Sequence, residues 1–456
     1  MKKFNVPLVN YFLIPANLPI DELITNNKPN FKCKPDKIAY IVNLMYEIPA
    51  HNKRYRDLSE IPINTRILRK SVDDYPDYMN YLVDNNVLYT DYSYTIGEKS
   101  RCYSITPDYH SELVPYYITD FTMLKKINKH TQYLKFDHSS SLLYLSKWFN
   151  DKLEINFDEA VKYNNSLYEI NINESPKNAY NKYASYFYNI EHIKRKNFRF
   201  FRDDTSFRLH TNLTTLKKDF RKFITYDGQP LCSYDFANSQ PYLATPLFNL
   251  DFYDCKSNIY NLFNASPKIY NEIIKNKKCS KEIFNILQED SLFARNDKDY
   301  HSNADFIEKA QEGLIYDYIE DAIFDSTGYR CINRDELKSM LFMVFYSDNS
   351  FLTQDKAKNK LIFKNTFPGV YNAFKFIKKG NNARLPILLQ TMESQLVIDN
   401  IAKTIAKAKP DLPIFTVHDS IVTLPGYDDL IYKIMKEESI KLIGIPPKIK
   451  YDFPWK

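Results

Sequence analysis

Two aspartates stand in sequence contexts that could carry chemistry. Asp235 falls late in the apolar stretch 230–237, and Asp419 lies within a second apolar, β-branched segment, 412–424. Burying a carboxylate without a partner costs several kcal/mol, so acids placed on apolar strands are expected to face cations. Metal ions meet that requirement most simply. The two aspartates are therefore predicted to form a metal site.

A regular pattern of cations and rings lies between the two aspartates. Within residues 332–347, Arg334, Lys338, Phe342 and Tyr346 recur every four positions. On an α-helix this spacing forms one stripe, with both cations nearer the amino-terminal end and two aromatic rings after them. Such a face can hold a triphosphate on its cations while the rings stack on a base or sugar. A surface helix with a chance ladder is the alternative.

The elements around the aspartates would bring them together. The stretch 230–237 is predicted to be a buried strand, followed by a helix that begins near Tyr242. The segment 412–424 is predicted to be a β-hairpin whose tip consists of residues 418–420, because two apolar runs flank His-Asp-Ser there. A strand end and a hairpin tip can oppose each other, which places both carboxylates at one site.

Composition limits the class of protein. The 456-residue chain is 44% hydrophobic, 15% aromatic and 26% charged, which is typical of a globular protein of two or three domains. The net charge is only +6, so an anion-binding surface must come from local clustering. With 8 glycines, the chain has no Gly-rich phosphate loop of the Rossmann or P-loop type.

Cysteine usage and hydropathy predict a cytoplasmic protein. The six cysteines form no C-x-x-C pair, so we interpret them as free thiols in a reducing compartment. No long apolar run and no basic-then-apolar amino terminus is present, so neither a membrane span nor a secretion signal is expected.

Residues 1–115 are predicted to be a winged-helix-like module, with an extended, proline-rich arm over residues 1–34. Three short helices and then two strands are predicted at 37–46, 64–70, 75–83, 87–94 and 101–105. The loop between the strands carries Lys99 and Arg101 as a basic tip. In a winged helix, a helix enters the major groove and the wing lies on phosphates. A small packing module without a ligand is the alternative.

Residues 116–205 are predicted to be a linking or thumb-like region that ends in a basic cluster. Its five cations alternate with aromatic residues and are Lys194, Arg195, Lys196, Arg199 and Arg202. Cations with stackable rings suit a nucleic-acid backbone and exposed bases. A solvated helix face is the alternative.

Three motifs occur in one order along residues 180–450. The segment 207–235 contains Arg-Leu, Asn-Leu, Arg-x-Phe and Gly-x-x-Leu-x-x-Asp, at Arg208-Leu209, Asn212-Leu213, Arg221/Phe223 and Gly228/Leu231/Asp235. It is similar to the segment before the first catalytic Asp of family A DNA polymerases. The stripe beginning at Arg334 resembles that family's fingers helix, Arg-x3-Lys-x3-Phe-x3-Tyr-Gly. Val417-His418-Asp419 resembles its closing hairpin, and nothing in the first 175 residues resembles the proofreading exonuclease.

The resemblance implies an α+β right-hand fold of palm, fingers and thumb, with palm and fingers in 206–456. It implies template-directed nucleotidyl transfer on a DNA primer-template, with dNTPs as substrates and NTPs possible. Asp235 and Asp419 would hold two Mg²⁺ ions, with the Phe236 carbonyl as a further ligand. Arg334 and Lys338 would bind the β- and γ-phosphates, and Lys338 would also assist catalysis.

The resemblance assigns the remaining site residues to the base pair and the nucleic acid. Phe342 and Tyr346 would close over the nascent base pair. Arg208 and His418 would contact the primer terminus, and Gln390 would read the template side, where the family has Gln-Gly-Thr.

The chain departs from the family at the position that selects the sugar. Five residues after the first Asp, family A DNA polymerases have a Glu that excludes the ribose 2′-hydroxyl, and this chain has Gln240. Ser347 replaces the Gly after the fingers Tyr. Residues 418–420 read His-Asp-Ser, as in phage-type single-subunit RNA polymerases, rather than His-Asp-Glu. Gln240 has nearly the volume of Glu and can pair with the Tyr346 hydroxyl, so deoxynucleotides are expected.

The compact size and the Gly-poor, Asn/Lys/Tyr-rich composition favour a DNA polymerase of a phage, plasmid or other mobile element. A single-subunit RNA polymerase or primase is one alternative. An alternative of another class is a non-catalytic replication initiator that binds DNA and keeps a polymerase-like body as a scaffold. A scaffold has no need of two clustered acids facing Arg334 and Lys338, which argues against it.

Overall fold

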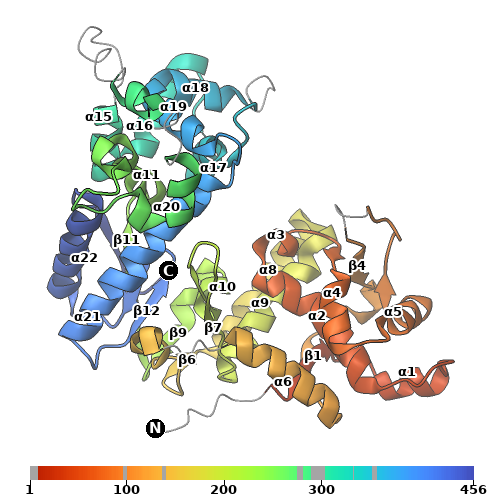
Figure 1. Ribbon diagram of the computed structural model, residues 1–456. Helices are drawn as coiled ribbons and strands as arrows, with labels where there is room; N and C mark the ends of the chain where they lie inside the picture. Colours follow the sequence, from red (N-terminus) through yellow and green to blue (C-terminus); the bar gives the residue numbers. More distant parts are fainter. Residues whose placement is uncertain are drawn as a thin grey trace. The chain divides into compact units, whose positions relative to one another are not determined.

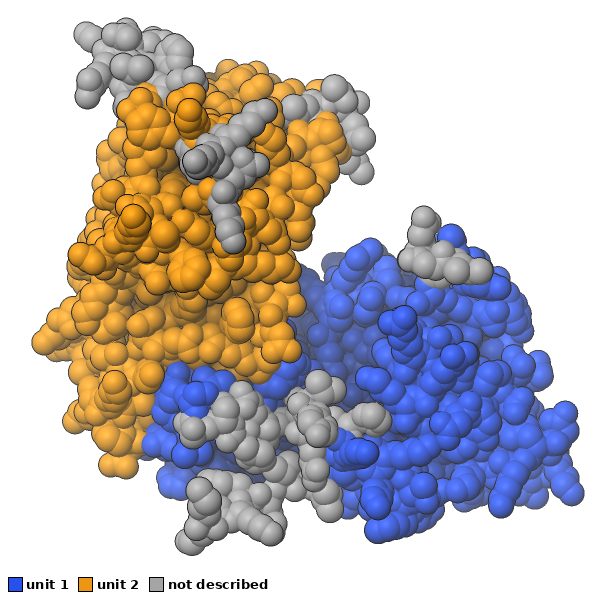
Figure 2. Space-filling view, in the orientation of Figure 1, with its two compact units in different colours: residues 1–201, 210–230, 456 blue, residues 202–209, 231–455 orange. Residues whose placement is uncertain are grey.

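The protein has a mixed α+β architecture in which many helices accompany several small sheets (Figure 1). The computed structural model describes residues 9–95, 100–135, 140–274, 281–288, 303–331, 333–351 and 357–456. The chain divides into two compact units (Figure 2). Unit 1 comprises residues 1–201, 210–230 and 456, and unit 2 comprises residues 202–209 and 231–455.

In the described part of unit 1, the first element is a paired strand rather than an extended arm. Strand β1 (Tyr11–Pro15) pairs antiparallel with β5 (Leu113–Tyr117), and helix α1 (Ile20–Asn26) follows it. The prediction of an arm over residues 1–34 is therefore wrong for this segment. Pro15 ends the strand and Pro19 directly precedes the helix, which are positions where proline is tolerated.

The predicted helix-and-ribbon region forms a small three-stranded sheet with helices. Its elements are α2 (Pro35–His51), α3 (Lys53–Arg56), β2 (Ile61–Pro62), α4 (Thr65–Ser71), α5 (Tyr75–Asp84), β3 (Leu88–Tyr89) and β4 (Cys102–Ile105). The sheet order is β2-β4-β3. The three predicted helices are present, but the predicted strand 87–94 is limited to Leu88–Tyr89. Lys99, at the predicted wing tip, lies outside the described residues.

Helix α2 is the centre of the unit 1 core. It is apolar over most of its circumference and packs against β1 and α9 (Pro176–Lys194). Helix α9 also packs along α8 (Phe157–Glu174). The other helices and strands of this part of the chain are α6 (Phe121–Lys135), α7 (Leu143–Ser146), β6 (Leu153–Ile155), β7 (Phe200–Arg202), β8 (Leu209–Thr211), α10 (Asn212–Thr215), β9 (Ile224–Tyr226) and β10 (Gln229–Pro230).

Unit 2 is built on a four-stranded antiparallel sheet with the order β12-β13-β11-β14. The strands are β11 (Cys232–Phe236), β12 (Ile414–Val417), β13 (Ser420–Thr423) and β14 (Ile449–Asp452). Helix α20 (Arg384–Ser394) continues through Gln395–Ala402 into α21 (Lys403–Ala408), and the middle of this segment packs on β12, β13 and α22 (Asp428–Ile443). The sheet thus has a helical cover.

The rest of unit 2 is helical and has an aromatic core. Its helices are α11 (Ser239–Leu243), α12 (Leu262–Ala265), α13 (Pro267–Ile273), α15 (Asn303–Glu312), α16 (Ile315–Thr327), α17 (Arg334–Tyr346), α18 (Lys358–Thr366) and α19 (Pro368–Lys378). The rings of Phe306, Phe363, Phe367 and Phe374 pack together there. Helix α11 begins at Ser239, three residues before the predicted start at Tyr242.

Hydropathy and cysteine states agree with two further expectations. Within the described ranges, every helix is too short or too polar to cross a membrane. The five cysteines in those ranges are free thiols, namely Cys33, Cys102, Cys232, Cys255 and Cys331. Cys279 lies outside the described residues.

Candidate active site

The sheet of unit 2 brings Asp235 and Asp419 to one place. Asp235 in β11 is the register partner of Ser420 in β13, and Asp419 directly precedes Ser420. Because Val417 pairs with Ser420, the hairpin turn has two residues, His418 and Asp419. The predicted three-residue tip is therefore one residue too long. Both aspartates lie at the same end of the sheet, Asp235 in a strand and Asp419 in the adjacent turn.

Backbone geometry and hydroxyl groups orient these acids. His418 has φ 56°, in the left-handed region that a tight hairpin turn uses and that His tolerates better than most residues. The Ser233 hydroxyl donates to Oδ2 of Asp235 at 2.8 Å, and the Ser420 hydroxyl donates to Oδ1. Asp235 is thus a half-exposed side chain with both carboxylate oxygens oriented by hydroxyl groups.

Helix α17 has the bounds Arg334–Tyr346, and Asn333 caps its first turn through a bond from the Glu336 N–H at 2.9 Å. One face is buried, and the opposite, more exposed face carries the predicted stripe of Arg334, Lys338, Phe342 and Tyr346. The Phe342 and Tyr346 ring centroids are 5.5 Å apart.

Within the described ranges, the ion-pair partners of both cations of the stripe are weak. Arg334 Nη1 lies 3.4 Å from Asp317 Oδ1, and Lys338 Nζ lies 3.4 Å from Asp335 Oδ1. All four side chains of these pairs are largely exposed, and such pairs contribute little stability. An incoming anion can therefore compete for the two cations.

Tyr316 of α16 links the stripe to the acidic site. The Arg334 guanidinium lies over its ring, 5.2 Å from the centroid. Burial raises the pKa of Tyr316 to about 12; the Arg334 charge acts in the lowering direction and the Asp419 charge in the raising direction. Tyr316 is therefore within electrostatic range of both groups, one from α17 and one from the hairpin turn.

A buried polar cluster lies beside the acids. Glu393 of α20 accepts bonds from Nε and Nη2 of Arg208, at 2.8 to 3.1 Å, and from Nε2 of Gln240 at 3.0 Å. The Tyr346 hydroxyl lies 3.5 Å from Oε1 of Gln240. Burial raises the pKa of Glu393 to about 7, against the lowering effect of Arg208; the Asp419 charge raises it further. The structure therefore places the Tyr346 hydroxyl at the limit of hydrogen-bond distance from Gln240, the residue with which it was predicted to pair.

The other predicted site residues take different positions. Arg208 has Nε and Nη2 engaged by Glu393, so its Nη1 is the nitrogen left for a primer contact. His418 is exposed in the hairpin turn. Phe236 is buried, and its ring stacks on the ring of Tyr242 with the two ring centroids 5.8 Å apart. Gln390 is half-buried on α20, about one helical turn before Glu393.

Sequence reasoning missed Glu393 and two buried lysines. Lys378 Nζ donates to the carbonyls of Val344 at 2.8 Å and Ser347 at 3.1 Å, and Lys360 Nζ donates to the Ser347 hydroxyl at 3.0 Å. Ammonium groups at a helix carboxyl end satisfy its unpaired carbonyls and its dipole. These lysines thus hold the end of α17 next to Tyr346.

One of the missed residues had a signal in the sequence. Leu385, Leu389 and Glu393 recur every four residues, so an acid stands on the apolar face of a helix. An acid at such a position needs a partner. Lys378 sits in an ordinary amphipathic stretch, and nothing local distinguishes it.

The oxygen donors fit magnesium. In the part of the chain that the structure describes, no three His, Cys, Asp or Glu side chains gather as metal ligands. A site here would consist of the Asp235 and Asp419 carboxylates, completed by a backbone carbonyl such as that of Phe236. Magnesium sites commonly use one or two carboxylates together with substrate phosphates.

The basic cluster 192–202 is partly engaged in internal contacts. Arg202 makes two bonds, of 2.7 and 2.8 Å, to Asp399, and Lys196 donates to two backbone carbonyls at 2.7 and 2.8 Å. Arg195 pairs with an acid one turn earlier in α9, yet it and Lys194 are exposed. The nucleic-acid interpretation of this segment stays a prediction.

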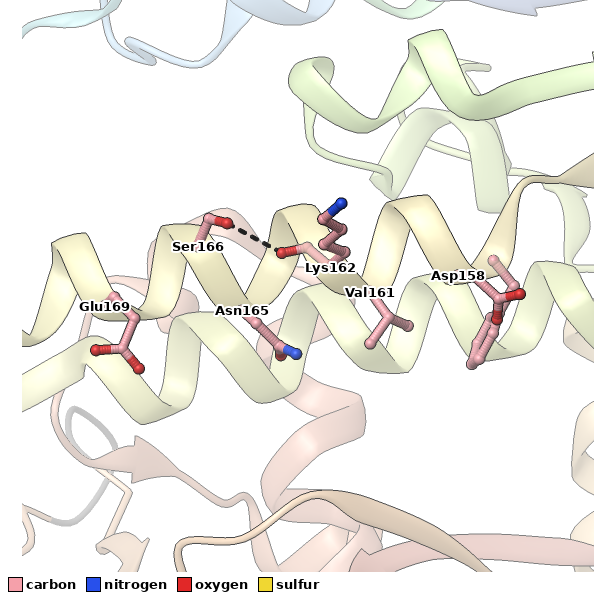
Figure 3. A pocket seen from close by; sticks show the side chains of 7 residues that line it. Asp158, Val161, Lys162, Asn165, Ser166 and Glu169 are labelled. Carbon is pink, nitrogen blue, oxygen red and sulfur yellow. Dashed lines mark hydrogen bonds between the residues drawn. The ribbon is translucent and has the colours of Figure 1, made fainter.

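A hollow in unit 1 offers no comparable site. It runs along one face of α8, and the Ser166 hydroxyl there donates to the Lys162 carbonyl at 3.1 Å (Figure 3). Its lining residues all belong to that helix and are Phe157, Asp158, Val161, Lys162, Asn165, Ser166 and Glu169. Chemical groups therefore do not converge on it from different elements.

Comparison with known proteins adds a distant structural likeness. No family model matches the sequence, and no curated protein does. Among solved structures, the POL domain of Pol1 from M. smegmatis, in complex with DNA primer-template and dNTP, aligns over 72% of this chain and 72% of that chain. The TM-score is 0.38 and the identity 10%. Such a score does not establish a shared fold, so a functional assignment has to rest on the site itself.

Proposed function

We propose that the protein is a template-directed nucleotidyltransferase, a DNA polymerase that extends a primer with dNTPs. The observation that carries the proposal is the β11–β13 register, which places Asp235 beside the turn that holds Asp419. The same unit presents Arg334 and Lys338 on the exposed face of α17, and Tyr316 lies within electrostatic range of Asp419 and Arg334. Two acids and two available cations are the groups that phosphoryl transfer requires.

Each group would have a separate task. Bound magnesium would lower the pKa of the primer 3′-hydroxyl and neutralise charge on the triphosphate. The Ser233 and Ser420 hydroxyls hold the Asp235 carboxylate in one orientation before any ligand binds. Arg334 and Lys338 would exchange their weak surface partners for the β- and γ-phosphates. Phe342 and Tyr346 would stack on the nascent base pair.

Gln240 would select the sugar. It is buried beside Tyr346, and a side chain of that length would crowd a ribose 2′-hydroxyl. A specific observation favours a second candidate, RNA synthesis or priming. Ser420, the serine of the His-Asp-Ser signature, bonds directly to Asp235 and is therefore part of the site.

We also propose that the module within residues 1–115 binds duplex DNA. The order α2, β2, α4, α5, β3, β4, with a β2-β4-β3 sheet, supports a winged-helix interpretation. The exposed charges of α5 are acidic, at Asp77 and Asp84, which disfavours contact with phosphates. Helix α4 instead exposes Arg66, Arg69 and Lys70. Phosphate contacts are therefore assigned to α4.

A primer-extension assay tests the main proposal. A labelled primer is annealed to a DNA or an RNA template and supplied with magnesium and either dNTPs or NTPs. Extension with dNTPs on DNA is expected, and it should disappear in the Asp235→Asn variant. Extension only with NTPs would establish the RNA-synthesis alternative. Duplex binding without extension in any combination would favour the non-catalytic initiator.

A further inference from the structure

Glu393 is a buried carboxylate whose position calls for an explanation. Its side chain is 3% exposed, and it lies between the guanidinium of Arg208 and the amide of Gln240. Replacing a buried ion pair with apolar residues of similar volume is often neutral or stabilising. Stability alone therefore does not account for a buried acid at this point of α20.

The contact with Glu393 determines how the Gln240 amide is turned. In its ionised form a carboxylate only accepts hydrogen bonds, so Glu393 then binds the Nε2 end of the amide, here at 3.0 Å. The Oε1 end then faces the Tyr346 hydroxyl, 3.5 Å away. Without Glu393, either end of the amide could turn towards Tyr346.

Arg208 keeps Glu393 in place for this contact. Its Nε and Nη2 both bond to the carboxylate, which leaves little rotational freedom at the Glu393 side chain. Arg208 directly precedes β8, Gln240 lies in α11 and Glu393 in α20, and all three residues belong to unit 2. The arrangement therefore joins rigid parts of the unit rather than neighbouring residues.

We propose that Glu393 is a positioning residue that fixes the Gln240 amide and thereby sets the preference for deoxyribose over ribose in the incoming nucleotide. This inference rests on the proposed polymerase function. With Glu393 present, the group that Gln240 turns towards Tyr346 is a carbonyl oxygen. Contacts at both ends of the amide hold the Gln240 side chain over the sugar position; with one end released, the side chain can move aside and leave space for a ribose 2′-hydroxyl.

The Glu393→Gln variant tests the proposal in the full-length chain. Its amide offers both a donor and an acceptor, so it no longer selects one orientation of Gln240. The ratio of kcat/KM for dATP to that for ATP, in single-nucleotide incorporation, should fall about tenfold, as expected for one hydrogen bond. The factor by which kcat for dATP changes should be smaller than the factor by which KM for ATP changes. Thermal unfolding reports whether the variant is folded.

A second variant separates positioning from mere packing. Glu393→Met fills a similar volume but offers the Gln240 amide no strong hydrogen bond, so selectivity should fall at least as far as in Glu393→Gln. Asp399→Asn is the matched control, because it breaks another bidentate arginine–carboxylate pair, Arg202–Asp399. Selectivity should be unchanged in that control.

The outcomes are distinguishable. If the unaltered protein incorporates neither nucleotide, the proposed function and this inference both fail. If it incorporates nucleotides and Glu393→Gln leaves the dATP-to-ATP ratio unchanged, the inference alone fails. If Glu393→Gln does not fold, Glu393→Met decides. Lost selectivity in that variant supports positioning, and retained selectivity contradicts it.

Discussion

The hydroxyl of Ser420 donates a hydrogen bond to the carboxylate of Asp235, its register partner across β13 and β11. Asp419 directly precedes Ser420, so this bond ties the acid of the strand to the turn that carries the second acid. A shift of the register by one residue would turn Asp235 to the other face of the sheet. The pairing of the two strands therefore assembles the acidic site.

Replacing either acid should abolish turnover while leaving binding intact. Asp235→Asn and Asp419→Asn keep side-chain volume but remove the charge that magnesium needs, so primer extension should fall by several orders of magnitude. Binding of primer-template, measured by fluorescence anisotropy, should change little. Asp411→Asn, at an exposed position before β12, serves as the control. Near-normal extension by either site variant would refute the metal assignment.

Lys338→Ala should impair both nucleotide binding and chemistry. A phosphate contact that strengthens in the transition state affects KM and kcat together, so kcat/KM should fall by about ten- to a hundredfold. Steady-state kinetics with varied dNTP concentration would measure this. Lys364→Ala removes an exposed lysine from the neighbouring helix α18 and should leave the kinetics unchanged. Unchanged kinetics in Lys338→Ala would place the triphosphate elsewhere.

Gln240→Gly should relax sugar selection. Removing the side chain opens space for a 2′-hydroxyl, so ribonucleotide incorporation should rise about tenfold while deoxynucleotide use falls only modestly. Competition between dATP and ATP on one template would report both effects. A preference for ribonucleotides in the unaltered protein would contradict the gate and favour the RNA-synthesis alternative.

Helix α4 should contribute salt-sensitive DNA binding. The double variant Arg66→Gln/Lys70→Gln removes two exposed charges, so the slope of log K against log salt should become shallower by about two. Titration of duplex DNA at several salt concentrations would measure the slope. Lys162→Gln/Lys177→Gln removes two exposed charges from α8 and α9 and should have no such effect. Equal slopes in the two double variants would leave the amino-terminal module without a DNA-binding role.

Lys378 should make stability depend on pH. Burial lowers its pKa from 10.5 to about 8. Between these values the unfolded chain holds more protons than the folded one, so this contribution to the free energy of unfolding rises with pH. The contribution of Lys378 to stability is complete above pH 10.5 and is lost as the pH falls through about 8. Urea unfolding of the protein and of Lys378→Met at pH 7.5 to 9.5 should give a difference that grows with pH in favour of the unaltered protein. A constant difference would contradict the assignment.

Local sequence patterns were sufficient for the elements that carry the candidate chemistry. The four-residue repeat predicted a helix within 332–347, and the structure has Arg334–Tyr346. The apolar runs around Asp419 predicted the hairpin to within one residue of its turn. The proline pattern of residues 1–34 predicted an extended arm, and this prediction was wrong. Pro15 and Pro19 stand only at the edges of a strand and a helix, where proline does not interrupt either element.

The sequence by itself determined which side chains share a helix face or a strand, since those relationships follow from the 3.6- and 2-residue periods of the backbone. The tertiary structure alone decided which faces meet. Arg208 and Glu393 are 185 residues apart, and Lys378 reaches the carbonyl of Val344 across 34 residues. Such contacts depend on how whole elements pack around a common core, and no local period encodes that packing. The oriented Gln240 amide and the anchored end of α17 are properties of the folded unit.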